Sequence, residues 1–135
     1  MAIFLGGGLD HRAGPSGRPS GSSSRDRGGV APIGRAFNRV RFSDGSATLA
    51  YSGDTEWTDA LVSIADGAQL FIVECSGYAG RIPYHLTWEV LAPRLSDLRA
   101  RQIMITHMNS TILAHLDEVR AAGVLVAEDG DVIEL

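Results

Sequence analysis

Two short, almost continuous apolar runs constrain the fold of this chain most strongly. They are residues 69–74 (QLFIVE) and residues 102–106 (QIMIT). Runs of this length are typical of strands that are buried on both faces, as in parallel sheets covered by other layers. The two runs therefore predict inner strands of a sheet, around which the other elements of the chain are arranged.

Two further pairs of strand-like segments carry a hairpin signal, an Asp-Gly dipeptide between short alternating runs. In the first pair the turn is Ser43-Asp44-Gly45-Ser46, and in the second it contains Asp129-Gly130. The flanking segments are residues 37–42 with 47–51, and residues 124–127 with 132–135. The sequence thus predicts one hairpin before the inner strands and a second one after them.

Three segments fit helices in the gaps between these strands. They cover residues 59–65, about 86–100 and about 111–122. Thr58 is placed to cap the first, and Gly67 follows its end. Pro93 removes a backbone donor and is expected to bend or split the second. The order of strands and helices predicts an α/β fold, a mixed sheet with covering helices.

Composition divides the chain near residue 36. Residues 6–35 are mostly Gly, Ser, Pro and Arg, which provide too little apolar surface to offset the entropy of ordering them. We therefore predict a disordered basic arm over residues 1–36 and a folded unit over residues 37–135. Residues 1–41 carry seven Arg and two acids, whereas residues 42–135 carry five Arg and fourteen acids. Nucleic-acid binding by the arm is one interpretation and a solvated tail is the other.

Several classes of protein are excluded by composition. Cys75 is the single cysteine, so no intrachain disulfide can form, which suits a reducing compartment. No apolar run approaches the roughly 18–20 residues that a membrane span requires, and the first five residues lack the features of a signal peptide. These observations predict a cytoplasmic protein with no membrane partner. Cys75 itself is expected to pack as a small apolar side chain.

Chemically active side chains lie at the carboxyl ends of three predicted strands. Asp54, Glu74 and His107 lie at successive strand ends, and His85 lies in the loop before the second helix. Because ligands bind at the carboxyl ends of strands in open α/β sheets, these residues predict a shared site. Carboxylate and imidazole groups are suitable ligands for Zn²⁺. The structural alternatives are a turn-forming or helix-capping Asp54 and a hydrogen-bonded core His107, and His115 is expected at the surface or at its boundary.

Four motifs carry a resemblance to a known family. The segments LAYSGDTEWTDALV, LFIVEC, YHLTWEVL and QIMITHM, within residues 38–135, resemble the C-terminal half of metallo-β-lactamase fold hydrolases. The likeness is to the branch similar to ribonuclease Z and its phosphodiesterase relatives. It implies half of an αββα sandwich. It also implies that Asp54 bridges two zinc ions, that His107 is the last histidine ligand, and that Glu74 orients His85.

The same resemblance implies a function. The chain is expected to be a metal-dependent hydrolase that uses zinc-activated water on a phosphodiester or another small ester, with His85 contacting the phosphate or protonating the leaving group. A nucleic-acid substrate follows only if the activity is like that of ribonuclease Z. Tyr78, Arg81 and Tyr84 precede or adjoin His85 and are candidate substrate contacts, an ordinary surface loop being the alternative.

The chain departs from the family on its N-terminal side. The family's His-x-His-x-Asp-His motif is missing, and the nearest trace, Asp10-His11, has Gly6 and Gly8 where the earlier histidines would stand. This trace is either a vestige or a coincidence. We therefore expect at most a partial zinc site, little activity from this truncated chain alone, and a bare apolar sheet face. The alternative function is a non-catalytic half-domain that joins a complementary chain or a second copy.

Overall fold

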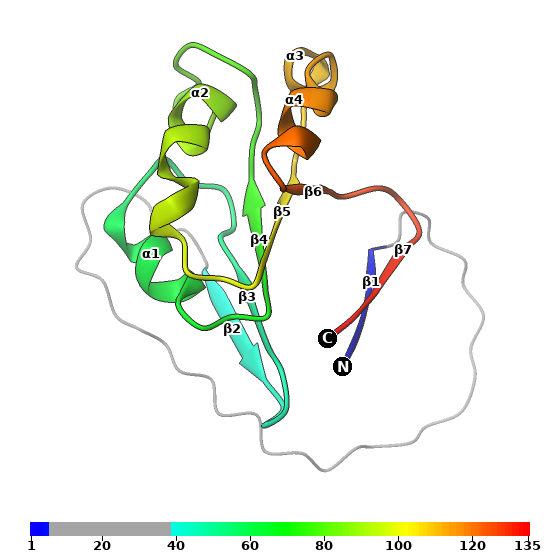
Figure 1. Ribbon diagram of the computed structural model, residues 1–135. Helices are drawn as coiled ribbons and strands as arrows, with labels where there is room; N and C mark the ends of the chain where they lie inside the picture. The colour runs from blue at the N-terminus through cyan, green and yellow to red at the C-terminus, as the bar shows by residue number, and fades with distance from the viewer. Residues whose placement is uncertain (6–38) are drawn as a thin grey trace, which may run out of the picture.

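A five-stranded mixed sheet forms the centre of the domain in this computed structural model, which describes residues 1–5 and 39–135. Figure 1 shows the arrangement of the strands and helices. In spatial order the strands are β2 (Val40–Ser43), β3 (Thr48–Tyr51), β4 (Leu70–Glu74), β5 (Gln102–Thr106) and β6 (Leu125–Val126). β2 is antiparallel to β3, and the other neighbours are parallel. Every residue of β4 is buried, which confirms the inner strand predicted from its apolar run.

Helices cover one face of this sheet. They are α1 (Asp59–Ala65), α2 (Trp88–Leu91), the 3₁₀ helix η1 (Ala92–Asp97), α3 (Ser110–Leu113) and α4 (Leu116–Ala121). Leu61, Leu91 and Val119 from these helices share one apolar core with Phe71 and Ile105 of the sheet. None of the helices in the described ranges combines the length and apolar character that crossing a bilayer requires.

The local signals in the sequence behave as their chemistry dictates at several points. In the first hairpin, Asp44 Oδ1 accepts hydrogen bonds from the backbone N–H groups of Ser46 and Ala47, and Gly45 adopts a φ of 92°. After Leu91 the second helix changes from α to 3₁₀ form at Pro93, as predicted from the missing backbone donor.

Two helix predictions are correct in position and wrong in detail. Thr58 precedes α1 but makes no side-chain cap, and its hydroxyl instead accepts a hydrogen bond from Arg39 Nη2 at 3.0 Å. The third predicted helix, over about residues 111–122, is broken between α3 and α4. His115 lies at that break and stacks on the ring of Tyr78 with 3.6 Å between centroids. It therefore begins a helix instead of lying within one.

The second predicted hairpin is wrong. β6 pairs with β5, whereas β7 (Asp131–Glu134) pairs in antiparallel fashion with β1 (Ala2–Leu5) at the other end of the chain. Both segments are strands, but each finds a partner distant in sequence. The predicted disorder of residues 1–36 is likewise wrong for residues 2–5, which form β1. The remainder of that segment, including Asp10-His11, lies outside the described residues.

The two-stranded ribbon of β1 and β7 lies on the sheet face opposite the helices. Ile3 and Ile133 of the ribbon pack against Leu70, Ile72 and Met104, which are all buried. The expectation of a bare apolar sheet face is therefore wrong for this part of the sheet. Pairing of the two ends of the chain provides the covering layer, so helices, sheet and ribbon form three successive layers.

Candidate metal centre

Three neighbouring parallel strands bring chemically active side chains to one edge of the sheet. Asp54 follows β3, Glu74 is the last residue of β4, and His107 follows β5 directly. Because β3, β4 and β5 are adjacent and parallel, their carboxyl ends meet at the same edge. Parallel pairing thus produces the clustering predicted from the sequence.

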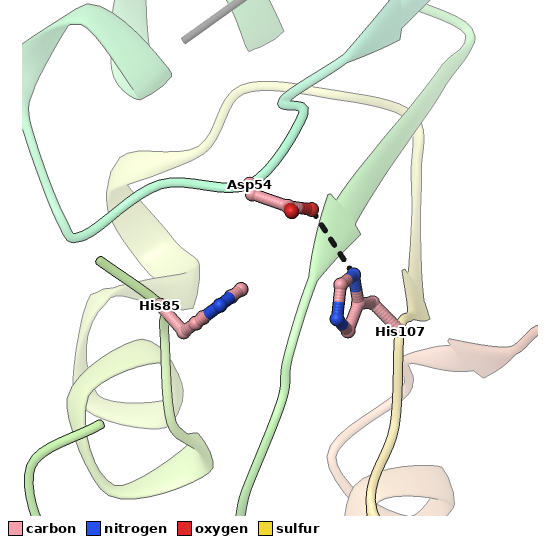
Figure 2. A group of neighbouring side chains, drawn as sticks. All are labelled: Asp54, His85 and His107. Atoms are coloured by element: carbon pink, nitrogen blue, oxygen red, sulfur yellow. Dashed lines mark ion pairs between the residues drawn. The ribbon is translucent and has the colours of Figure 1, made fainter. Parts of the chain in front are cut away.

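Asp54, His85 and His107 form a compact group at this edge. Figure 2 shows the three side chains directed toward one another. Asp54 Oδ1 lies 3.0 Å from His107 Nδ1, and the rings of His85 and His107 are 5.1 Å apart between centroids. One ligand atom from each residue lies within 4.8 Å of the others. Asp54 and His107 are each about half exposed, at 48%, so the group opens to solvent.

Strained backbone positions two of the residues around the group. His107 has a φ of 60° and Tyr84, immediately before His85, has a φ of 69°. Side chains other than glycine rarely adopt this left-handed region, and the cost is of the order of 1–3 kcal/mol at each position. Such conformations persist when the surrounding structure requires them, and they are concentrated at functional sites. One strained residue, His107, is itself a histidine of the group, and the other, Tyr84, directly precedes His85.

Glu74 holds several groups around the site in place through hydrogen bonds. Its carboxylate is fully buried and accepts hydrogen bonds from the backbone N–H of Thr55, from Ser76 Oγ at 2.9 Å, and from His85 Nδ1 at 3.0 Å. An ionised carboxylate only accepts hydrogen bonds, so His85 carries its proton on Nδ1. This arrangement leaves His85 Nε2 available to the group, a pattern common among metal-binding histidines.

The donor set fits a divalent metal ion. One carboxylate and two imidazoles provide three ligands of the kind that catalytic zinc sites use, with open positions for water or substrate. The mutual spacing of up to 4.8 Å requires only small side-chain movements to place all three atoms on one ion. The contact between His85 and Glu74 adds the outer hydrogen bond that fixes the orientation of such a ligand.

The candidate substrate contacts lie in different surroundings. Tyr78 donates its hydroxyl to Glu118 Oε2 and stacks on His115, so it joins the loop to α4. The hydrogen bond to Glu118 raises the pKa of the Tyr78 phenol. Arg81 lies 3.6 Å from Glu56 and lines an open groove that also contains His85. Tyr84 is exposed and does not line this groove.

Cys75 is buried beside the site, and we predict that its thiol is unreactive in the folded protein. Burial, with a smaller contribution from the Glu74 carboxylate, raises the pKa of Cys75 to about 12. An ordinary thiol, with a pKa near 8.5, is about one-quarter thiolate at pH 8, so the reactive fraction falls by roughly a thousandfold. Iodoacetamide at pH 8 should label Cys75 only after denaturation, as measured by mass spectrometry. Rapid labelling of the native chain would contradict this.

Comparison with known proteins gives no match to any family model and none to any curated protein. Solved structures do match. YhfI from Bacillus subtilis, a metallo-β-lactamase fold protein, aligns with 71% of this chain and 43% of its own at 24% identity and a TM-score of 0.60. This chain has the metallo-β-lactamase fold. The likeness extends to Zn²⁺-bound PqqB from Methylobacterium extorquens, with 72% and 40% of the two chains covered, 18% identity and a TM-score of 0.62.

A third structure with the metallo-β-lactamase fold is the short form of human tRNase Z. It matches 71% of this chain and 36% of its own at 21% identity, with a TM-score of 0.52. This chain thus spans less than half the length of each of these three metallo-β-lactamase fold proteins. The fold predicted from the four sequence motifs is confirmed.

Two residues that adjoin the site have no clear signal in the sequence. Glu56 Oε1 accepts the backbone N–H of Tyr84 at 3.3 Å and pairs with Arg81, and Trp57 lines the same groove. Both follow Asp54 in a segment without regular structure. A Trp between a turn and a helix is indistinguishable in sequence from one that only anchors the core. Their position two and three residues after Asp54 is the single indication of a role.

Proposed function

We propose that this chain provides a metal-dependent hydrolase site for a phosphodiester or another small ester. The observation that carries the proposal is the convergence of Asp54, His85 and His107 at one sheet edge. A buried carboxylate that holds one of these imidazoles supports it further. The metallo-β-lactamase fold of the domain is consistent with this chemistry, since Zn²⁺-bound PqqB shares that fold.

Asp54 and His107 are the proposed metal ligands, and Zn²⁺ is the ion that their chemistry suits. When bound, Zn²⁺ lowers the pKa of a bound water and polarises the oxygen of the ester. Asp54 Oδ1 and His107 Nδ1 lie 3.0 Å apart at the exposed edge, so the two side chains would hold one ion together. The family resemblance implies two ions in a complete site, and the described residues provide only part of that ligand set.

His85 is proposed to accept on Nε2 the proton that the attacking water releases and to transfer it to the departing oxygen. Its Nδ1–H donates to Glu74, which fixes the ring plane and leaves Nε2 free of that contact. A positioned imidazole contributes roughly 10²–10⁴-fold when it protonates a leaving group. Glu74 is a positioning residue in this scheme, because it acts through His85. A phosphodiester is favoured as substrate by the likeness of the fold to human tRNase Z.

A zinc titration with an activity assay tests this function. The full chain is titrated with Zn²⁺ by calorimetry and then assayed with bis-p-nitrophenyl phosphate, before and after removal of the ion by a chelator. We expect zinc to bind and hydrolysis, though slow, to depend on it. The absence of zinc binding, or turnover that a chelator leaves unchanged, would refute the proposal.

A second candidate is a half-domain that completes its site with a complementary chain or a second copy. It is favoured because the chain spans less than half of the matched structures and because the metal group holds three described residues. Light scattering on the zinc-loaded sample separates the two candidates. A monomer with zinc-dependent turnover supports the hydrolase, whereas a zinc-dependent dimer supports the half-domain.

A further inference from the structure

An open groove of about 490 Å³ begins at the metal group. His85 belongs to both, since it lines the groove and also lies with Asp54 and His107. A volume of this size is within the range of about 300–1,000 Å³ that small-molecule sites occupy. A substrate whose reactive group lies at Asp54 and His107 would therefore extend past His85 into the groove.

The groove has an aromatic wall and an aliphatic lining. Trp57 is half-buried in the wall, and Ile82, Leu86 and Val90 provide apolar surface. The guanidinium of Arg94 lies over the Trp57 ring at 5.3 Å and donates to the carbonyl of Val90 at 2.7 Å. These contacts hold the indole in place, so its surface is organised before any ligand arrives.

The charges around the groove offer no surplus positive charge to a second anionic group. Arg81 is the only arginine among the described lining residues, and it is paired with Glu56 at 3.6 Å. Glu89 provides a second carboxylate, which accepts the backbone N–H of Gly80. Arg81 and Arg94, which lies against Trp57, together match the two carboxylates, so a phosphate placed here would find no surplus positive charge. The lining therefore suits a neutral group better than an anionic one.

We propose that this groove binds a neutral aromatic group of the substrate, attached to the ester that reacts at the metal group. The placement of the reacting ester rests on the proposed function, whereas the binding of the aromatic group rests on the groove alone. Stacking on an indole is insensitive to the identity of the ring, because every aromatic ring has a π face. The groove thus favours a flat, uncharged moiety over a diphosphate.

The two tryptophans of the chain allow a direct test. Trp57 lines the groove, whereas Trp88 is buried, donates its Nε1–H to Glu118 Oε1 at 2.8 Å and does not line the groove. In the metal-free ¹⁵N-labelled chain, adenosine should shift the indole N–H signal of Trp57 and leave that of Trp88 in place. Ribose 5-phosphate, which is anionic and lacks an aromatic ring, should shift neither.

A variant adds a quantitative measure. Trp57→Leu should raise the dissociation constant of adenosine, measured by equilibrium dialysis, by roughly tenfold, because stacking on the indole is lost. Phe42→Leu is the matched control, since Phe42 is an exposed aromatic of β2 that does not line the groove. Circular dichroism tests whether both variants fold. If Trp57→Leu does not fold, the shift experiment on the unaltered ¹⁵N-labelled chain still decides the proposal.

Two outcomes overturn the proposal: no shift of Trp57 with millimolar adenosine, or a larger shift with ribose 5-phosphate. Neither measurement requires a metal ion. If the chain binds adenosine at Trp57 but binds no zinc, the groove proposal stands and the hydrolase proposal is refuted. If the chain binds zinc and hydrolyses the test diester but the Trp57 signal does not respond to adenosine, the hydrolase proposal stands and the groove proposal is refuted.

Discussion

Replacing Asp54 with alanine is expected to lower the zinc affinity of the chain by more than about 100-fold. Asp54 is the only carboxylate of the three-residue metal group, and its Oδ1 lies 3.0 Å from His107 Nδ1. Loss of an outer hydrogen-bond partner already reduces metal affinity by about 10–100-fold in characterised sites, so loss of a ligand should cost more. Competition with a chromophoric chelator measures the change.

Asp66→Ala provides the matched control for this experiment. Asp66 is an exposed carboxylate at the end of α1, and it has no place in the metal group. The substitution removes the same charge, so it reports any general electrostatic effect on zinc binding. His107→Ala should reproduce the loss seen with Asp54→Ala. If Asp54→Ala and Asp66→Ala bind zinc equally well, the ion is held elsewhere and the proposed centre is wrong.

The inner part of the fold could be predicted from the sequence because its signals are local. The apolar run from Leu70 to Glu74 is fully buried, and Asp44-Gly45 forms the turn that its chemistry requires. Pro93 ends the α-helical hydrogen bonding where its missing N–H demands it. In each case the residues that determine the structure lie within a few positions of one another.

The outer part could not be predicted because its partners are distant in sequence. Asp129-Gly130 satisfies the local rule for a hairpin, yet β7 pairs with β1, where Ala2 lies opposite Glu134. The local rule describes the turn and contains no information about competing strands. Burial of Leu70 and Met104 beneath the ribbon favours the distant pairing, since it removes apolar surface from water.

The candidate site, like the fold, could be predicted from the sequence only in part. Asp54 and His107 could be placed together from their positions at strand ends, because parallel pairing dictates a shared edge. The contact between Glu74 and His85 was implied only by the family resemblance, since the loop that returns His85 to β4 has no periodic signal. Trp57 was not identified at all, because its role depends on the loop packed beside it.

Glu74→Gln is expected to change the tautomer of His85 with a moderate loss of stability. The carboxylate now accepts hydrogen bonds from Thr55, Ser76 and His85. An amide of the same shape keeps only one acceptor oxygen. Because the backbone N–H of Thr55 is the donor least able to turn away, the amide oxygen should face Thr55. The amide NH₂ then faces His85 Nδ1, so the imidazole proton should move to Nε2. We expect a loss of about 1–3 kcal/mol in unfolding free energy.

Two measurements separate positioning from simple loss of stability. Long-range ¹H–¹⁵N NMR spectra report the tautomer of His85, and urea denaturation reports the free energy of unfolding. Glu74→Ala leaves all three buried donors without a partner and should cost about 3 kcal/mol or more. The exposed Glu89→Gln should alter neither quantity. An Nε2-protonated ring has no lone pair on Nε2 for a metal ion, so Glu74→Gln should also weaken zinc binding if His85 is a ligand. If His85 keeps its proton on Nδ1 in the Glu74→Gln variant, Glu74 does not set the tautomer.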